Sequence, residues 1–432
     1  MTAPQPFRNL ALARARFTRG FVALRVRNYR LYWLGQLISN VGTWMQSTAQ
    51  AWLVLQLTRS PFAIGLVTAF QFLPVMVLAL VGGVVADRVP RHRLLVVTQS
   101  LALVLALAFG ALVGTGLIQL WQVYIIALLS GIVTAIDAPV RQAFAVELVG
   151  PEDRANAVAL NSMLFNGARI IGPALAGMLI GRLGIATIMY LNGASYLAVI
   201  AGLLLMDPRR FYTLGPRGGG SVLERLREGL RYITGTPEVL RVMLLIAAIG
   251  TFGYNFSVVL PLVGGFILHT DATEYGGLGT ALGIGSLAGS LATAFARRVS
   301  VHRLLAAAGA FSVLLGAMAL TTTYELALVV LIALGFAGVL FSTTANTLLQ
   351  LEVPDALRGR VMSVYTLLFM GSTPVGGLLV GGAAHALGVA NALVLCAALC
   401  LLGVGATLIY GRHAPAGVAP GISPVNPHDG NG

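Results

Sequence analysis

The chain has 432 residues, of which 57% are hydrophobic and only 10% are charged. Ordinary soluble domains contain about 25% charged residues, so this composition excludes a soluble protein and suits a chain embedded in a bilayer. The net charge of +13 does not indicate nucleic-acid binding, because the arginines lie in short gaps between apolar runs and form no single basic patch.

Twelve apolar runs follow one another along the chain, each long enough for a transmembrane helix, which takes about 20 residues. The predicted spans are 29–57, 62–86, 93–114, 120–142, 155–181, 184–206, 239–268, 276–297, 302–322, 325–350, 358–384 and 388–411. The chain is therefore predicted to be an all-α membrane protein. In chain order we expect a cytoplasmic N-terminal arm, a first six-helix half, a cytoplasmic linker, a second six-helix half and a disordered cytoplasmic tail, at 1–28, 29–206, 207–237, 238–411 and 412–432.

The distribution of arginine predicts the orientation. With the N-terminus inside, the cytoplasmic segments hold nearly all arginines, the external segments hold only Arg59 and Arg182, and Arg169 lies within a span. Positive residues favour the cytoplasmic side of a membrane protein, so both termini are predicted to be cytoplasmic. The absence of Lys and the abundance of Ala and Gly indicate a bacterial genome, and hence the bacterial inner membrane.

The two halves repeat each other. Residues 154–177 and 358–381 align at a constant offset of 204, which pairs Gly172 with Gly376 and Gly177 with Gly381. Two parallel six-helix halves joined by a cytoplasmic loop are the plan expected for major facilitator transporters. In the linker, residues 221–234 have an amphipathic pattern. We interpret them as a helix lying on the inner headgroups, with a docking site as the alternative.

A charged motif lies between the second and third spans, with the pattern G-x-x-x-D-R-x-x-R-x-R. Its members are Gly83, Asp87, Arg88, Arg91 and Arg93. It resembles the major facilitator signature G-x-x-x-D-R-x-G-R-R/K, with Pro90 where Gly is usual. A glycine lets two helices approach closely, and a carboxylate can accept hydrogen bonds from the open N-terminus of a helix.

Asp87 is predicted to meet such a helix end in the second half, at the span that begins near Arg358 and Arg360. The family resemblance implies that this contact latches the cytoplasmic gate while the transporter faces outward. The alternative is a basic loop that only fixes topology.

The fifth span contains a second motif, made of Gly167, Gly172, Pro173 and Gly177. Small residues permit close helix crossing, and proline removes one backbone hydrogen bond and bends the helix. The motif resembles the G-P-x-x-G antiporter motif in a shifted form, which in relatives accompanies exporters. Packing alone also explains such glycines.

Three charges are predicted to lie within the membrane: Asp137, Arg141 and Arg169. At 1.5 Å per residue, Asp137 and Arg169 fall within roughly 10 Å of the same depth. Charges at this depth are costly unless they are paired or face a wet cavity. One interpretation is a proton- or substrate-responsive pair of Asp137 with Arg169 on the transport path; the other is a structural ion pair of Asp137 with Arg141.

Polar and aromatic residues in several spans are candidates for the wall of a transport cavity, because unsatisfied polar groups avoid lipid. Two rows at helical spacing are Gln36, Asn40, Thr43, Ser47 and Gln50 in the first span, and Thr343, Asn346, Thr347 and Gln350 in the tenth. Further candidates for binding an aromatic or amphipathic solute are Trp44, Phe70, Gln71, Tyr254 and Asn255. Hydrogen bonds between helices explain each single polar residue equally well.

No enzyme constellation is present in the sequence. A P-loop needs a lysine and the chain has none, so an ATP-driven pump within this chain is excluded, although a partner ATPase is not. The six histidines show no metal-ligand spacing, and Cys396 and Cys400 are interpreted as small buried hydrophobes. We expect no metal or cofactor, and a protein that works as a monomer with the bilayer and a small-molecule substrate as its partners.

Three further stretches resemble one branch of the major facilitator superfamily, the drug:H⁺ antiporter-3 group or transmembrane secretion effectors. They are residues 27–33 with 39–44, 57–61 and 358–363. The resemblance covers about residues 17–411 and implies proton-driven export of siderophores or antibiotics. Many drug/proton antiporters carry an arginine four residues before the glycine in the fourth span, where this chain has Ala127 before Gly131. A nutrient importer and a non-transporting membrane sensor are the alternatives.

Overall fold

The computed structural model describes residues 20–212, 222–295 and 299–413, and within these ranges the regular elements are all helices. The long helices of the first half are α2 (Arg27–Thr58), α3 (Pro61–Arg88), α4 (Arg91–Gly114), α5 (Leu120–Glu147) and α6 (Arg154–Leu204). The linker contributes α7 (Val222–Gly235), and the second half contains α8 (Pro237–Phe252), α9 (Phe256–Leu262), α10 (Ala272–Ala294), α11 (Val301–Ala317), α12 (Tyr324–Glu352), α13 (Asp355–Gly371), α14 (Thr373–Leu387) and α15 (Val389–His413).

Ten helical stretches of the described chain are long and apolar enough to cross a membrane. Helix α2 is not among them because its row of polar side chains lowers its hydropathy, yet it packs along α6 within the first bundle. Helix α6 counts once although Gly184, with φ of 79° and ψ of 168°, divides it into two crossings. The chain is thus an all-α membrane protein of twelve transmembrane segments in two six-helix halves.

Two of the spans predicted as continuous helices are broken. The seventh consists of α8, α9 and a π-helical turn (Val263–Ile267), and it is interrupted at residues 253–255. The eleventh is divided at Ser372 into α13 and α14. Proline explains why a new helix begins after Ser372, since Pro374 occupies the first turn of α14, where its missing N–H is not needed.

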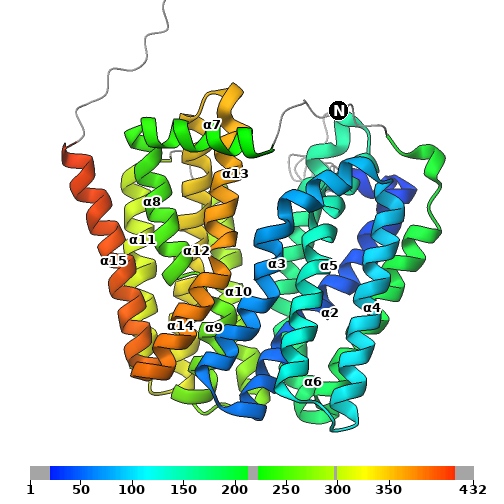
Figure 1. Ribbon diagram of the computed structural model, residues 1–432, viewed down its shortest axis with the longest axis horizontal. Coiled ribbons are helices and arrows are strands. Elements are labelled where there is room, and N and C mark those ends of the chain that lie inside the picture. Colours follow the sequence, from blue (N-terminus) through cyan, green and yellow to red (C-terminus); the bar gives the residue numbers. More distant parts are fainter. Residues whose placement is uncertain (1–19, 213–221, 296–298, 414–432) are drawn as a thin grey trace, which may run out of the picture.

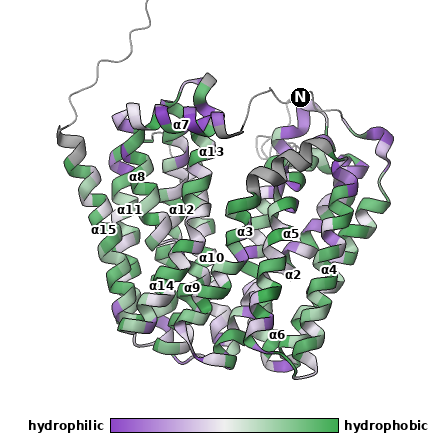
Figure 2. Ribbon diagram, in the orientation of Figure 1, coloured by the Kyte–Doolittle hydropathy of each residue, from purple (hydrophilic) through white to green (hydrophobic). Residues whose placement is uncertain are grey.

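The helix ends define two faces of the molecule. Helix α7 lies across the second bundle on the face where the described chain begins, and we refer to this as the α7 face (Figure 1). The opposite end carries the turns that follow α2, α4 and α14 and the turn that precedes α10. We refer to this end as the far face. Hydrophobic residues cover the middle of both bundles, whereas hydrophilic residues gather at the ends and along α7 (Figure 2).

The two halves meet along two seams, one between α3 and α14 and the other between α6 and α10. A Cβ atom on Gly381 would lie 3.0 Å from the Cα atom of Gly65, and one on Gly177 would lie 2.9 Å from the Cα atom of Gly276. Both close approaches are near the far face. Because Gly177 and Gly381 are equivalent in the internal repeat, the two seams use the same feature of the repeated sequence.

Helix α7 is docked on α13. The ion pair between Arg360 and Glu228 measures 2.7 Å, and the Arg360 carbonyl oxygen would lie 2.9 Å from a Cβ atom on Gly229. Ile233 is buried beneath the helix, whereas Leu230 remains 46% exposed. The amphipathic helix is therefore attached to the second half, a contact that its hydrophobic pattern alone does not reveal.

Candidate transport site

A buried ion pair lies in the first half. The carboxylate of Asp137, only 2% exposed, pairs with Arg141 one turn later on α5. Its Oδ1 atom also accepts hydrogen bonds from Thr98 (2.7 Å) and Gln99 (2.9 Å), both on α4. Asp137 is thus surrounded by donors, which compensate for the loss of water around its charge.

Helix α2 completes this site, which we call the ion-pair cluster. The guanidinium of Arg141 donates to the side-chain oxygen of Gln36 at 3.2 Å, and the Tyr32 hydroxyl donates to the Arg141 carbonyl oxygen at 3.2 Å. Within the described residues, the amide nitrogen of Gln36 and the amide oxygen of Gln99 are buried without a partner. The cluster links α2, α4 and α5, and it retains unused hydrogen-bonding capacity beside the charges.

Arg169 lies apart from the ion-pair cluster. Its guanidinium is 5.9 Å from the centre of the Trp44 ring, and Trp44 packs edge-on against Phe165 at 5.7 Å. The Arg169 backbone carbonyl oxygen would lie 3.4 Å from a Cβ atom on Gly283 of α10. Arg169 therefore sits in the first half at the edge of the seam with the second half.

An aromatic group lies at the break of the seventh span, in the second half. Tyr254, at the break between α8 and α9, contacts Phe369 at 4.9 Å and Phe311 at 5.5 Å. Tyr365 stacks on Phe369 at 5.9 Å. Residues of both halves therefore meet near Arg169, in one central region, through the contact of its backbone with Gly283 of α10.

The structure separates the predicted cavity residues by exposure. Thr43 is exposed and lies 3.4 Å from the Tyr196 hydroxyl, Asn40 donates to Gln36 at 3.2 Å, and Gln350 donates to Asn346 at 2.5 Å. Partly exposed positions also include Trp44, Ser47, Phe70, Gln71, Tyr254, Thr343, Asn346 and Thr347. These positions are accessible enough to line a solute path.

Three predicted cavity residues, Gln36, Gln50 and Asn255, are buried instead, Gln36 within the ion-pair cluster. Asn255 is fully buried, donates to the Thr251 carbonyl oxygen at 2.6 Å, and would lie 2.6 Å from a Cβ atom on Gly376. Gln50 is 7% exposed. In this conformation the Asn255 side chain fills space beside Gly376 of α14, because it follows the break in the seventh span.

The charged loop motif is described only in part. Gly83, Asp87 and Arg88, and with them the predicted latch, lie outside the residues whose side chains are described. Arg91 forms an ion pair with Glu147 at the end of α5, and Arg93 is exposed. Glu147 was missed in the sequence, although it is an acidic residue on the same predicted face as the motif.

The second-half arginines of the predicted gate are engaged within their own half. Arg358 pairs with Asp355 at 2.5 Å and donates to the Gln350 carbonyl oxygen at 2.9 Å. Arg360 pairs with Glu228, as described above. The start of α13 is therefore tied both to α12 and to the linker helix.

The residues of the fifth-span motif have different surroundings. A Cβ atom on Gly167 would meet nothing within 4 Å, whereas one on Gly172 would lie 3.2 Å from the Met45 backbone nitrogen. Pro173 packs against Gly279, and Gly177 packs against Gly276, both on α10. The motif thus begins in open space, crosses α2, and ends in the seam between the halves.

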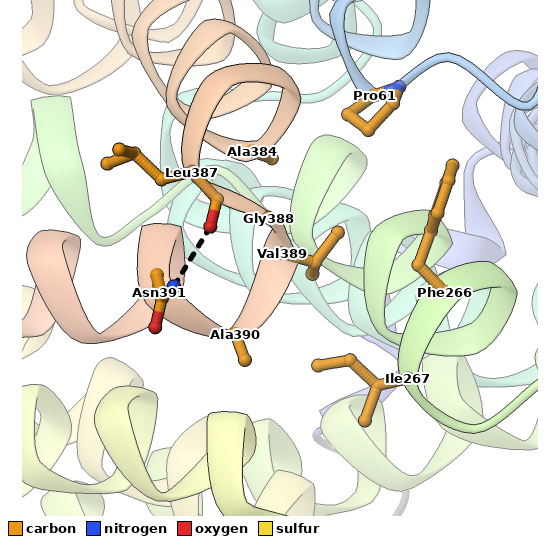
Figure 3. A pocket seen from close by; sticks show the side chains of 9 residues that line it. All are labelled: Pro61, Phe266, Ile267, Ala384, Leu387, Gly388, Val389, Ala390 and Asn391. Atoms are coloured by element: carbon orange, nitrogen blue, oxygen red, sulfur yellow. Dashed lines mark hydrogen bonds between the residues drawn. The ribbon is translucent and has the colours of Figure 1, made fainter.

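A separate pocket of about 420 Å³ opens at the far face (Figure 3). Pro61 reaches it from the first half, and Phe266, Leu387 and Val389 are among its lining residues from the second half. Its polar side chain is Asn391, which donates to the Leu387 carbonyl oxygen at 2.9 Å. This apolar pocket lies beside the α3–α14 seam, away from Arg169 and the ion-pair cluster.

Sequence comparison places this architecture among known proteins. A family model described as transmembrane secretion effector matches residues 18–427. The multidrug efflux pump Tap of Mycolicibacterium fortuitum is 29% identical over 86% of this chain and 93% of its own length. The staphyloferrin A transporter of Staphylococcus aureus is 25% identical over 81% and 87%, and the enterobactin exporter EntS of Citrobacter koseri is 24% identical over 89% and 92%.

Solved structures support the fold. The nucleoside transporter NupG superimposes with a TM-score of 0.68 at 11% identity, covering 89% of this chain and 99% of its own. A bacterial homologue of the lysosomal transporter Spinster, in an inward-facing and unoccupied conformation, gives 0.67 at 15% identity, with 89% and 97% covered. At such identities the likeness concerns the fold alone, which is that of the major facilitator transporters.

Proposed function

The chain belongs to the transmembrane secretion effector family of major facilitator transporters, and from this we propose that it exports a small amphipathic molecule from the bacterial cytoplasm by alternating access. The observation that carries the proposal is a match over almost the whole chain to relatives named as an efflux pump and a siderophore exporter. The glycine motif that ends in the α6–α10 seam adds support, because export requires that seam to open and close.

We propose that the protein lies in the bacterial inner membrane with its α7 face toward the cytoplasm. The arginine-rich segments support this orientation, because they belong to the helix ends and loops of that face. In this orientation the glycine contacts close the external side, so the conformation is one that admits solute from the cytoplasm. Rocking of the halves about the central region would part both seams and release solute outside.

The proposed driving force is the proton gradient. Asp137 is a buried carboxylate within the first half, and its contacts with Arg141, Thr98 and Gln99 would all weaken on protonation. Because these contacts link α4 and α5 and reach α2 through Gln36, protonation would loosen the packing of the first half. The proposed consequence is a change in the balance between the two conformations.

Transport in inverted inner-membrane vesicles tests the proposal. Vesicles from cells with and without the protein would be energised by a proton gradient and offered a panel of siderophores, macrolides and tetracyclines. We expect uptake of at least one solute into protein-containing vesicles, and its loss with a protonophore. Uptake only into right-side-out vesicles would indicate an importer. No difference for any solute would refute export and favour a non-transporting role.

A further inference from the structure

Arg169 carries a charge that the structure leaves unbalanced. No carboxylate of the described residues lies within ion-pair distance of its guanidinium, whereas Arg141 is paired with Asp137. A charge at this depth is costly without a counter-ion. The cation–π contact with Trp44 offsets part of that cost but leaves the positive charge in place.

Asp137 does not serve as the missing counter-ion in this structure. Both of its oxygen atoms are occupied, one by Arg141 and the other by Thr98 and Gln99. Moving it to Arg169 would leave Arg141 buried and unpaired, which is a costly arrangement. The ion-pair cluster is electrically balanced, so the net charge of the central region is that of Arg169.

Aromatic side chains lie beside the Arg169 guanidinium. Trp44 lies beneath the guanidinium, and Phe165 packs edge-on against Trp44. Aromatic faces favour flat apolar groups of a ligand. A guanidinium offers paired N–H donors that match a carboxylate or another planar anion.

We infer that the exported solute is an organic anion with an aromatic portion, and that Arg169 binds its negative charge beside Trp44. This inference rests on the export proposed above and specifies its solute. Binding supplies the counter-ion that Arg169 lacks, so a solute of this class gains more than a neutral or cationic one of the same shape. Because the Arg169 backbone packs against Gly283 of α10 in the second half, binding is sensitive to the relative position of the halves.

Three probes with one ring system test the charge preference: naphthalene-2-carboxylate, naphthalene-2-carboxamide and 2-naphthylmethylammonium. Their binding to the purified full-length protein in detergent would be measured by calorimetry, with acetate as an anion that has no ring. We expect the carboxylate to bind at least tenfold more tightly than the amide, the ammonium to bind weakest, and acetate to bind more weakly than the carboxylate.

Variants identify the residue responsible. Arg169→Gln should abolish the preference for the carboxylate, and Arg169→Lys, which keeps the charge, should retain part of it. Arg182→Gln is the matched control, because Arg182 is an exposed arginine at the far face and its loss should leave the preference intact. If Arg169→Gln does not fold, the comparison of Arg169→Lys with the parent still reports on the guanidinium.

Several results would overturn the inference: equal binding of the three naphthyl probes, preference for the cation, no binding of any probe, or a preference that persists in Arg169→Gln. Failure of the export proposal is seen separately in the vesicle assay. Proton-driven export of cationic or neutral solutes alone would refute the anion inference while leaving export intact.

Discussion

The seam between α6 and α10 leaves no room for a side chain at Gly177. A Cβ atom there would lie 2.8 Å from the Ala272 carbonyl oxygen and 2.9 Å from the Cα atom of Gly276. These neighbours are backbone atoms, which cannot rotate away as the end of a side chain can. Gly177→Ala should therefore force the seam apart and favour the conformation that is open at the far face.

The size of this shift follows from the cost of overpacking. One extra methyl group in a tightly packed site costs about 1–3 kcal/mol, and each 1.4 kcal/mol is about a tenfold change in an equilibrium constant. The ratio of far-face-open to far-face-closed molecules should rise about fivefold to about 150-fold. Alanine is the better helix former by about 1 kcal/mol, but this gain applies to both conformations and leaves their ratio unchanged.

Cysteine accessibility measures the shift. Thr280 lies in the same seam, where its hydroxyl is 3.4 Å from the Ile170 carbonyl oxygen. In a Thr280→Cys background, a membrane-impermeant maleimide added outside intact cells should react faster when Gly177→Ala is present. Gly167→Ala is the control, since it is the same change in the same helix with nothing within 4 Å. Equal labelling rates in the two variants would refute the steric reasoning.

Three further changes test other contacts. Gly381→Ala should reproduce the effect of Gly177→Ala at the α3–α14 seam, and unchanged labelling would mean that the seams do not act alike. Asp137→Asn should destabilise the protein by about 3 kcal/mol, which thermal unfolding measures. This is the low end of the cost of breaking a buried ion pair, because Arg141 keeps 29% exposure. The added change Arg141→Gln should recover part of the lost stability. Glu147→Gln should weaken the contact with the start of α4. A double-mutant cycle with Arg91→Gln should give a coupling energy of about 0.5–3 kcal/mol, whereas strictly additive effects would assign the pair no role.

Hydropathy was sufficient to predict twelve spans, because the bilayer acts on every helix in the same way, and the internal repeat was sufficient to predict two halves. The breaks in the seventh and eleventh spans were not predicted. Residues 253–255 and Ser372 lie in apolar runs whose average hydropathy resembles that of an unbroken helix. Averages over a span report burial in lipid and contain little information on local backbone geometry.

The central region was predicted in part. Depth along the membrane follows from residue count, and it drew attention to Asp137 and Arg169 together. Which way each side chain points depends on helix rotation and on neighbouring helices, which a single sequence does not specify. The structure turns Asp137 toward α4 and Arg169 toward Trp44, so the two charges at similar depth have different partners.

The far-face pocket of Figure 3 has a consequence for inhibition. Its wall combines Pro61 of the first half with residues of the second half, so the pocket keeps this shape only while the α3–α14 seam is closed. A small apolar compound that fills it would gain contacts in one conformation alone, and would stabilise that conformation in proportion to its differential affinity. Such a compound would slow turnover without occupying the site of the solute, and raising the solute concentration would not displace it.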